Sequence, residues 1–207
     1  MTALLHGAGA YAQVIKNSIG SYQEQETDVL KTDHLPFMGK EITGNENEMR
    51  EYLKGKGFKD VKNKDGKQVL KGKFATMDAT INFGIYEGNL YTVAVTFENK
   101  SSWKKLEEDF NTLRDNLIKK YGKPKERIEQ FSFPYRRGDG YEIKAVHYSK
   151  CLYKVLWELR EGYVMLMISP SEKEYLAHIA LIYTDGEAII NMTNKQLREQ
   201  KQIINDL

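Results

Sequence analysis

The chain has few of the cysteine and histidine residues that form disulfide bonds or bind metal ions. Its 207 residues include a single cysteine, Cys151. One cysteine excludes an internal disulfide framework and a cysteine-rich zinc site, and it leaves the cellular compartment open. The four histidines are His6, His34, His147 and His178, and they show no HExxH or related metal spacing. We therefore expect no metal and no cofactor.

Long apolar runs and a strong charge of one sign are also missing. The densest apolar stretch is "YVMLMI" at 163–168, far below the roughly 18 residues of a membrane-spanning helix. Lys and Arg total 31 against 29 Asp and Glu, a net charge of +2. A dedicated nucleic-acid binder has a larger basic excess. The sequence predicts a soluble α+β protein with no membrane span and no specific nucleic-acid partner.

The N-terminal residues 1–34 predict a lead-in, or the remnant of an export signal, ahead of a single domain at 35–207. The segment Ala10-Tyr11-Ala12 before Gln13 suits a signal cleavage site, but no basic region precedes it. An ordinary N-terminal segment is the alternative. We expect a periplasmic or extracellular location in preference to the cytoplasm.

A first, short helix of about three turns is predicted within "ITGNENEMREYLKGKGF". Asn45 and Glu48 have the spacing of a capping box, and Gly55 and Gly57 end the apolar periodicity. Beyond it, apolar and polar residues alternate on both sides of a Glu-Gly-Asn turn at 87–89, in the stretch "ATINFGIYEGNLYTVAVTFEN". This period of two indicates antiparallel strands with one buried face.

A second, longer helix is predicted at 103–121. Its apolar residues step by three or four positions and form one stripe: Trp103, Leu106, Phe110, Leu113, Leu117 and Tyr121. Ser102 can cap its start, and Gly122 and Pro124 stop it. We expect the stripe to pack on a sheet of the same chain; a helix offered to a partner is the alternative.

Five strand-like runs follow this helix, separated by turn residues: "ERIEQFSF", "YEIKAVHYSKC", "LYKVLWELREG", "GYVMLMIS" and "YLAHIALIYTD". Helix-then-strand order thus occurs twice, at about 43–98 and 102–185. The prediction is an antiparallel sheet of about seven or eight strands with two helices packed on one face, built as two tandem helix-plus-meander modules. A short helix is expected at the C-terminus.

Several stretches resemble an uncharacterised family of small, often exported bacterial proteins. They are "LPFMGKEITG", "MREYLKGKGF", "LKGKFATM", "SWKKLEEDFNTLRDNLIKKYGKP" and "LIYTDGEAIINM", which together extend over about 35–207. The alternation of helix and antiparallel meander is also similar to the modules of β-lactamase inhibitor protein and of small outer-membrane-assembly lipoproteins. The resemblance implies a binding fold and transfers no catalytic residue.

Catalytic constellations are hard to find. His147 and Cys151 fall in one strand-like run, which would place them about 13 Å apart, too far for proton transfer. His178 in "YLAHIALIY" fits a hydrogen-bonded histidine within a sheet. There is no phosphate-binding glycine loop and no GxSxG elbow. We predict that the protein is not an enzyme; a Cys/His hydrolase is the least favoured alternative.

Lysine is concentrated in one segment. Eight lysines lie between Lys54 and Lys73 against Asp60 and Asp65, a local charge of +6. A solvated loop explains this, and the alternative is a polyanion-binding module centred on Lys62, Lys64 and Lys67.

The segment "YRRGDGY" contains a tripeptide used elsewhere in adhesion, but its Gly-Asp-Gly is also typical of a tight turn. We interpret it as a turn and nominate Tyr135, Arg136 and Arg137 as loop contact residues. The predicted function is non-catalytic binding of an unknown protein or cell-envelope component.

Overall fold

The computed structural model describes residues 34–64, 66–191, 194–195 and 198. Nearly all of the predicted lead-in therefore lies outside the described residues, as does most of the predicted C-terminal helix. Residues 186–191, which precede the predicted segment 193–207, are helical. Among the described residues, no helix has the length and apolar character needed to cross a membrane.

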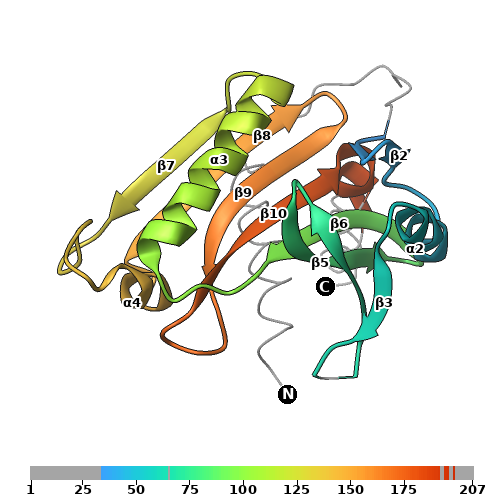
Figure 1. Ribbon diagram of the computed structural model, residues 1–207. Helices are drawn as coiled ribbons and strands as arrows, with labels where there is room; N and C mark the ends of the chain where they lie inside the picture. Colours follow the sequence, from blue (N-terminus) through green and yellow to red (C-terminus); the bar gives the residue numbers. More distant parts are fainter. Residues whose placement is uncertain (1–33, 65, 192–193, 196–197, 199–207) are drawn as a thin grey trace, which may run out of the picture. The chain divides into compact units, whose positions relative to one another are not determined.

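The fold is α+β, with a large antiparallel sheet of eight strands and a small sheet of two (Figure 1). The small sheet pairs β1 (Pro36–Phe37) with β2 (Lys40–Glu41). The elements of the main domain are α2 (Glu46–Gly55), β3 (Lys59–Lys62), β4 (Gln68–Phe74), β5 (Met77–Tyr86), β6 (Asn89–Phe97), α3 (Trp103–Tyr121), β7 (Glu126–Phe131), α4 (Glu142–His147), β8 (Cys151–Leu159), β9 (Gly162–Pro170) and β10 (Ala177–Asp185).

The large sheet consists of two four-stranded meanders joined at their last strands. Its order is β3-β4-β5-β6-β10-β9-β8-β7, so β6 and β10 meet in the middle. They pair antiparallel, with Leu181 opposite Val95 and Tyr183 opposite Val93. One helix precedes each meander, α2 before β3 and α3 before β7. The predicted fold class is confirmed.

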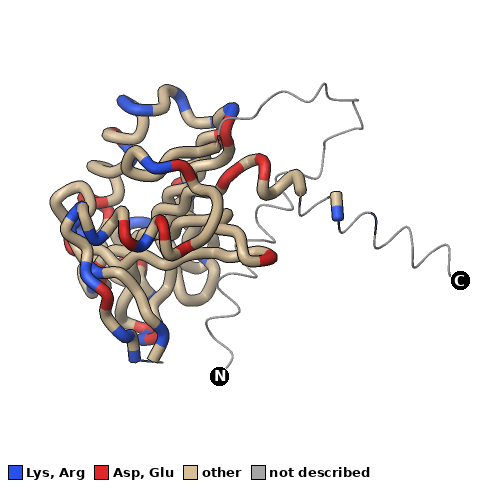
Figure 2. The backbone as a smooth tube through the Cα atoms, turned by 90° about the vertical axis from the view of Figure 1, so that its right-hand side faces the viewer, with Lys and Arg blue, Asp and Glu red and all other residues tan. Residues whose placement is uncertain are grey.

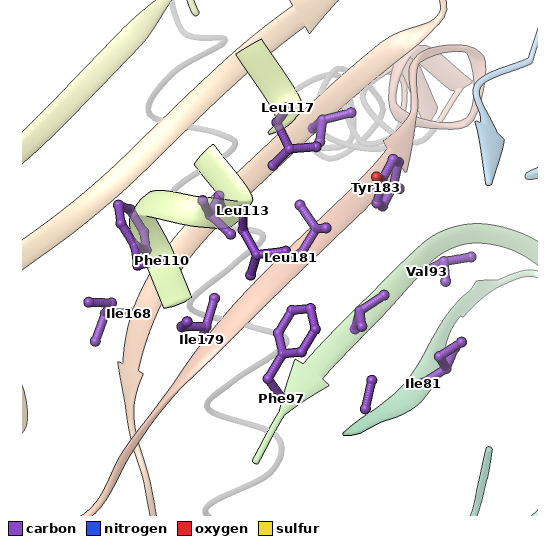
Figure 3. Packing of buried hydrophobic residues seen from close by; sticks show 14 of the residues in the cluster. Ile81, Val93, Phe97, Phe110, Leu113, Leu117, Ile168, Ile179, Leu181 and Tyr183 are labelled. Carbon is purple, nitrogen blue, oxygen red and sulfur yellow. The ribbon is translucent and has the colours of Figure 1, made fainter. Parts of the chain in front are cut away.

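Helix α3 lies across β8, β9 and β10 and buries the predicted stripe (Figure 1). Leu106, Phe110, Leu113 and Leu117 are all buried. In Figure 3, Phe110, Leu113 and Leu117 gather with side chains of the central strands, including Leu181. The Ser102 hydroxyl accepts a hydrogen bond from the Lys105 N–H, as expected of a cap. The stripe is therefore used inside the fold, and the alternative of a helix offered to a partner is wrong.

Helix α2 covers the same face of the sheet at its other half. Met49 and Leu53 are buried in the one core cluster, and the Arg50 guanidinium lies 5.4 Å from the ring centre of Phe83 on β5. Asn45 caps the helix by accepting from the Asn47 N–H. The Glu48 carboxylate pairs with Lys40. Asn45 thus acts as the predicted cap, although its bonded N–H is that of Asn47.

The prediction of a strand in "YEIKAVHYSKC" is wrong. Residues Glu142–His147 form α4, a turn follows, and β8 begins only at Cys151. Helix α4 packs against β8 and β9. Its residues Ile143 and Val146, three positions apart, are both buried. In a segment this short, helical and strand periodicity fit the same letters, and the tertiary contacts decide between them.

The packing of α3 generates a test of the core. Replacement of the fully buried Phe110 by Ala should lower the free energy of unfolding by about 3–5 kcal/mol, because it leaves a cavity between helix and sheet. The matched control is Phe133→Ala, since Phe133 is 90% exposed and should change stability by less than about 0.5 kcal/mol. Urea denaturation followed by circular dichroism measures both. Equal effects of the two variants would contradict the described packing.

Candidate functional site

Exposed aromatic side chains gather between β7 and β8, in residues 132–150. Phe133 is 90% exposed, Tyr141 59% and Tyr148 52%, and Tyr135 beside them is half-buried. We call these four residues the aromatic surface. Large apolar groups are rarely left in water in a group, and such groups mark contact sites.

Hydrogen bonds hold the chain that carries this surface. The Asp139 carboxylate accepts from the backbone N–H of Arg136 and of Tyr141, each at 2.8 Å. These two bonds lower the pKa of Asp139. The buried Glu142 carboxylate accepts from the Gly138 N–H at 2.8 Å. The "RRGDGY" segment is therefore the predicted turn, closed by its own Asp139 and by Glu142, which follows it.

Contacts between the two ends of the segment bring two of its aromatic rings together. The Ser132 N–H donates to the Lys150 carbonyl at 2.7 Å. The ring of Tyr135 stacks on that of Tyr148, with centres 6.4 Å apart and planes 8° from parallel. The Lys144 ammonium lies 5.8 Å from the Tyr148 ring centre. Aromatic and cationic groups thus share this surface.

The two arginines predicted as contact residues differ in their bonding. The Arg137 guanidinium donates to Glu107 on α3 at 2.9 Å, and this bond raises the pKa of Arg137. Glu107 also accepts from the Tyr153 hydroxyl at 2.7 Å. Arg137 is thus paired with a residue of α3, although most of its side chain stays exposed. The Arg136 side chain is exposed and forms no ion pair within the described ranges.

Sequence reasoning missed Phe133, Tyr141 and Tyr148. The alternation in "ERIEQFSF" predicts a strand that extends through Phe133, but β7 ends at Phe131. Pro134 follows directly and was the available signal, because proline cannot donate to a strand ladder. Tyr141 and Tyr148 flank α4, so the mistaken strand also hid their exposure.

The thiol and imidazole of "HYSKC" are not joined in one site. Burial, together with the carboxylates of Glu107 and Glu142, raises the pKa of the Cys151 thiol to about 12, which leaves it protonated at neutral pH. His147 Nε2 lies 2.8 Å from the Leu176 carbonyl oxygen. The two residues do not share the expected extended run, because His147 ends α4 and Cys151 begins β8. In the part of the chain that the structure describes, no group of three or more His, Cys, Asp or Glu could hold a metal ion.

The predicted lysine segment forms the edge hairpin β3–β4. Lys62, Lys64 and Lys67 are exposed and have no ion-pair partner among residues 34–64 and 66–191. Figure 2 shows lysine positions on both sides of the hairpin tip. Lys59 on β3 lies directly opposite Lys71 on β4, an arrangement of like charges that costs stability. The structure therefore brings the predicted lysines together.

The second face of the large sheet has an apolar centre. Leu156, Met165, Ala180 and Ile182 lie on it, and each is at most 7% exposed. These side chains are consequently buried and do not form open surface. His178 and Ser169 lie opposite each other on this face.

His178 is a histidine within a sheet, as predicted, but its ring has no hydrogen-bond partner among the described residues. Burial lowers its pKa to about 4. The Ser169 hydroxyl across from it is buried and also lacks a partner there. The imidazole of His178 is therefore neutral at pH 7.

Comparison of the chain with protein-family models, curated proteins and solved structures finds no match in any of the three. The resemblance to small exported bacterial proteins stays a prediction, as does the architectural likeness to β-lactamase inhibitor protein.

The neutral state of His178 generates a pH prediction. Between pH 6.5 and about 4 the unfolded chain takes up a proton at this residue while the folded chain does not, so stability falls as the pH is lowered through that range. His178→Gln should remove about 2–3 kcal/mol of that loss. Urea unfolding of both proteins at about pH 7, 6, 5 and 4 measures this pH dependence of stability. Equal pH slopes for the two proteins would contradict the assignment.

Proposed function

We propose that the protein is a non-catalytic binding protein whose contact site is the aromatic surface. The observation that carries this proposal is the 90% exposure of Phe133 on a segment held by backbone hydrogen bonds. Exposed aromatic and arginine side chains supply most of the energy in binding interfaces, and a pre-ordered loop loses little entropy on binding. Phe133, Tyr141, Tyr148 and Arg136 supply these residue types.

The partner is a protein or another component of the cell envelope. Support comes from the sequence, whose stretches resemble small and often exported bacterial proteins, and from the possible cleavage site before Gln13. A periplasmic or extracellular location accords with both. Binding proteins commonly place their contact residues on loops carried by a rigid sheet, as the aromatic surface is carried between β7 and β8.

Binding is favoured over hydrolysis by the state of the reactive groups. Cys151 is buried, with its pKa raised, and His147 bonds a backbone carbonyl. A nucleophilic thiol needs a lowered pKa and a base within hydrogen-bond reach. Neither condition is present at this pair.

A second candidate function is polyanion binding by Lys62, Lys64 and Lys67. It is favoured by these three lysines, which have no ion-pair partner among the described residues, and by the opposed pair Lys59 and Lys71. A bound phosphate, sulfate or carboxylate chain would relieve the repulsion between these two ammonium groups. The hairpin has no exposed aromatic ring at its tip for stacking, which favours contacts to a charged backbone.

Photo-crosslinking tests the proposed contact site. We expect p-benzoylphenylalanine at position 133 to yield a discrete cross-linked product with native envelope material. The same group at Ile85, which is 40% exposed on β5, should yield none. The Cys151→Ser background should retain the product, because the thiol is buried and plays no part. Indistinguishable patterns at positions 133 and 85 would refute the assignment of the site.

The polyanion candidate makes a separate prediction. Replacement of Lys62, Lys64 and Lys67 by Gln should abolish retention on heparin at about 0.3 M salt, because each removed cation no longer displaces a counterion. The matched control replaces Lys104, Lys105 and Lys119 on the exposed side of α3, which changes net charge equally. Equal loss in both variants would reduce the effect to net charge alone.

A further inference from the structure

Cationic side chains outnumber anionic ones in residues 132–150, with Arg136, Arg137, Lys144 and Lys150 against Asp139 and Glu142. Arg136, Lys144 and Lys150 are exposed there. The two carboxylates of the segment, Asp139 and Glu142, are engaged by backbone N–H groups. The outward-facing side of residues 132–150 is therefore apolar and cationic, which complements an anionic partner.

The apolar groups of this surface project outward. Phe133 keeps 90% of its surface in water, and Tyr141 and Tyr148 of the same segment are 59% and 52% exposed. A rigid protein partner would need a matching hollow to bury such a projecting ring. A bilayer interface deforms around it, accepts a Phe ring among the acyl chains and holds Tyr rings at the headgroups. Nearby Lys and Arg gain from anionic headgroups.

From this combination we infer that the aromatic surface binds the interface of an anionic lipid bilayer, with Phe133 inserted and Arg136, Lys144 and Lys150 at the headgroups. The inference rests on the proposed function, because it names the partner of the same site. One inserted ring with three cations gives reversible binding, far weaker than a spanning helix. Association should therefore depend on both the ring and the salt concentration.

The neighbouring β9–β10 connection limits which part of this end faces the lipid. His147 Nε2 contacts the Leu176 carbonyl, so this connection adjoins α4. It carries exposed Glu172 and Glu174 as well as Lys173. Because two carboxylates would be repelled by anionic headgroups, the lipid-facing side is the one formed by Phe133 and the β7–α4 loop.

The test uses the full chain with Phe133→Trp as a fluorescent probe. Native Trp157 is fully buried and Trp103 is packed in the core, so the added indole dominates the change on binding. We expect a blue shift and co-sedimentation with phosphatidylcholine vesicles containing about 30% phosphatidylglycerol, and neither with phosphatidylcholine alone. Ile85→Trp, at a partly exposed site on β5, should show no shift.

Two further variants separate insertion from charge. Phe133→Ser should weaken vesicle partitioning about tenfold, through the lost apolar contact. The double variant Arg136→Gln, Lys144→Gln should weaken partitioning similarly. Raising NaCl from about 0.1 to about 0.5 M should remove the difference between this double variant and the native protein, because salt screens the charges. Unchanged partitioning in Phe133→Ser would overturn the inference.

Failure of the inference can be told apart from failure of the proposed function. If vesicles of both compositions leave the Phe133→Trp spectrum unchanged, the lipid inference is overturned. A protein cross-link at position 133 in that case would keep the aromatic surface as a contact site for an acidic protein. Absence of both vesicle binding and cross-linking would overturn the inference and the proposed function together.

Discussion

The pairing of β6 with β10 is the interaction on which the fold depends. It joins two four-stranded meanders that would each expose an apolar face alone. Its register places Val93 and Val95 beside Tyr183 and Leu181 on the face that α2 and α3 cover. A slip of one residue would turn every one of these side chains to the other face, so burial on the helix side specifies this register strongly.

The elements that could be predicted were those with long, unambiguous patterns. Helix α3 has a stripe about five turns long, a capping serine and a terminal glycine, and no strand interpretation fits such a length. Helix α4 is only a turn and a half long. Alternation and helical spacing coincide over so few residues, and the contacts with β8 and β9 that select the helix involve residues distant in sequence.

The candidate site was predictable in its location and only partly in its members. Turn chemistry in "RRGDGY" pointed to the loop, because Gly and Asp there favour a tight bend. The partner of Arg137 is Glu107, thirty positions earlier, so no local pattern could show that this arginine is engaged. The exposure of Phe133 follows from the end of β7 at Phe131, and strand ends are poorly determined by alternation alone.

The aromatic surface lies within residues 132–150, whereas the corresponding connection of the first meander, between β3 and β4, comprises only residues 63–67. The second half thus carries a large insertion at a hairpin end while its strands keep the same arrangement as the first. The connection is nevertheless part of the scaffold, because Ile143, Ala145 and Val146 of α4 are buried in the core cluster. A shortened variant of this connection therefore has to keep α4, whose side chains fill the core beside β8 and β9.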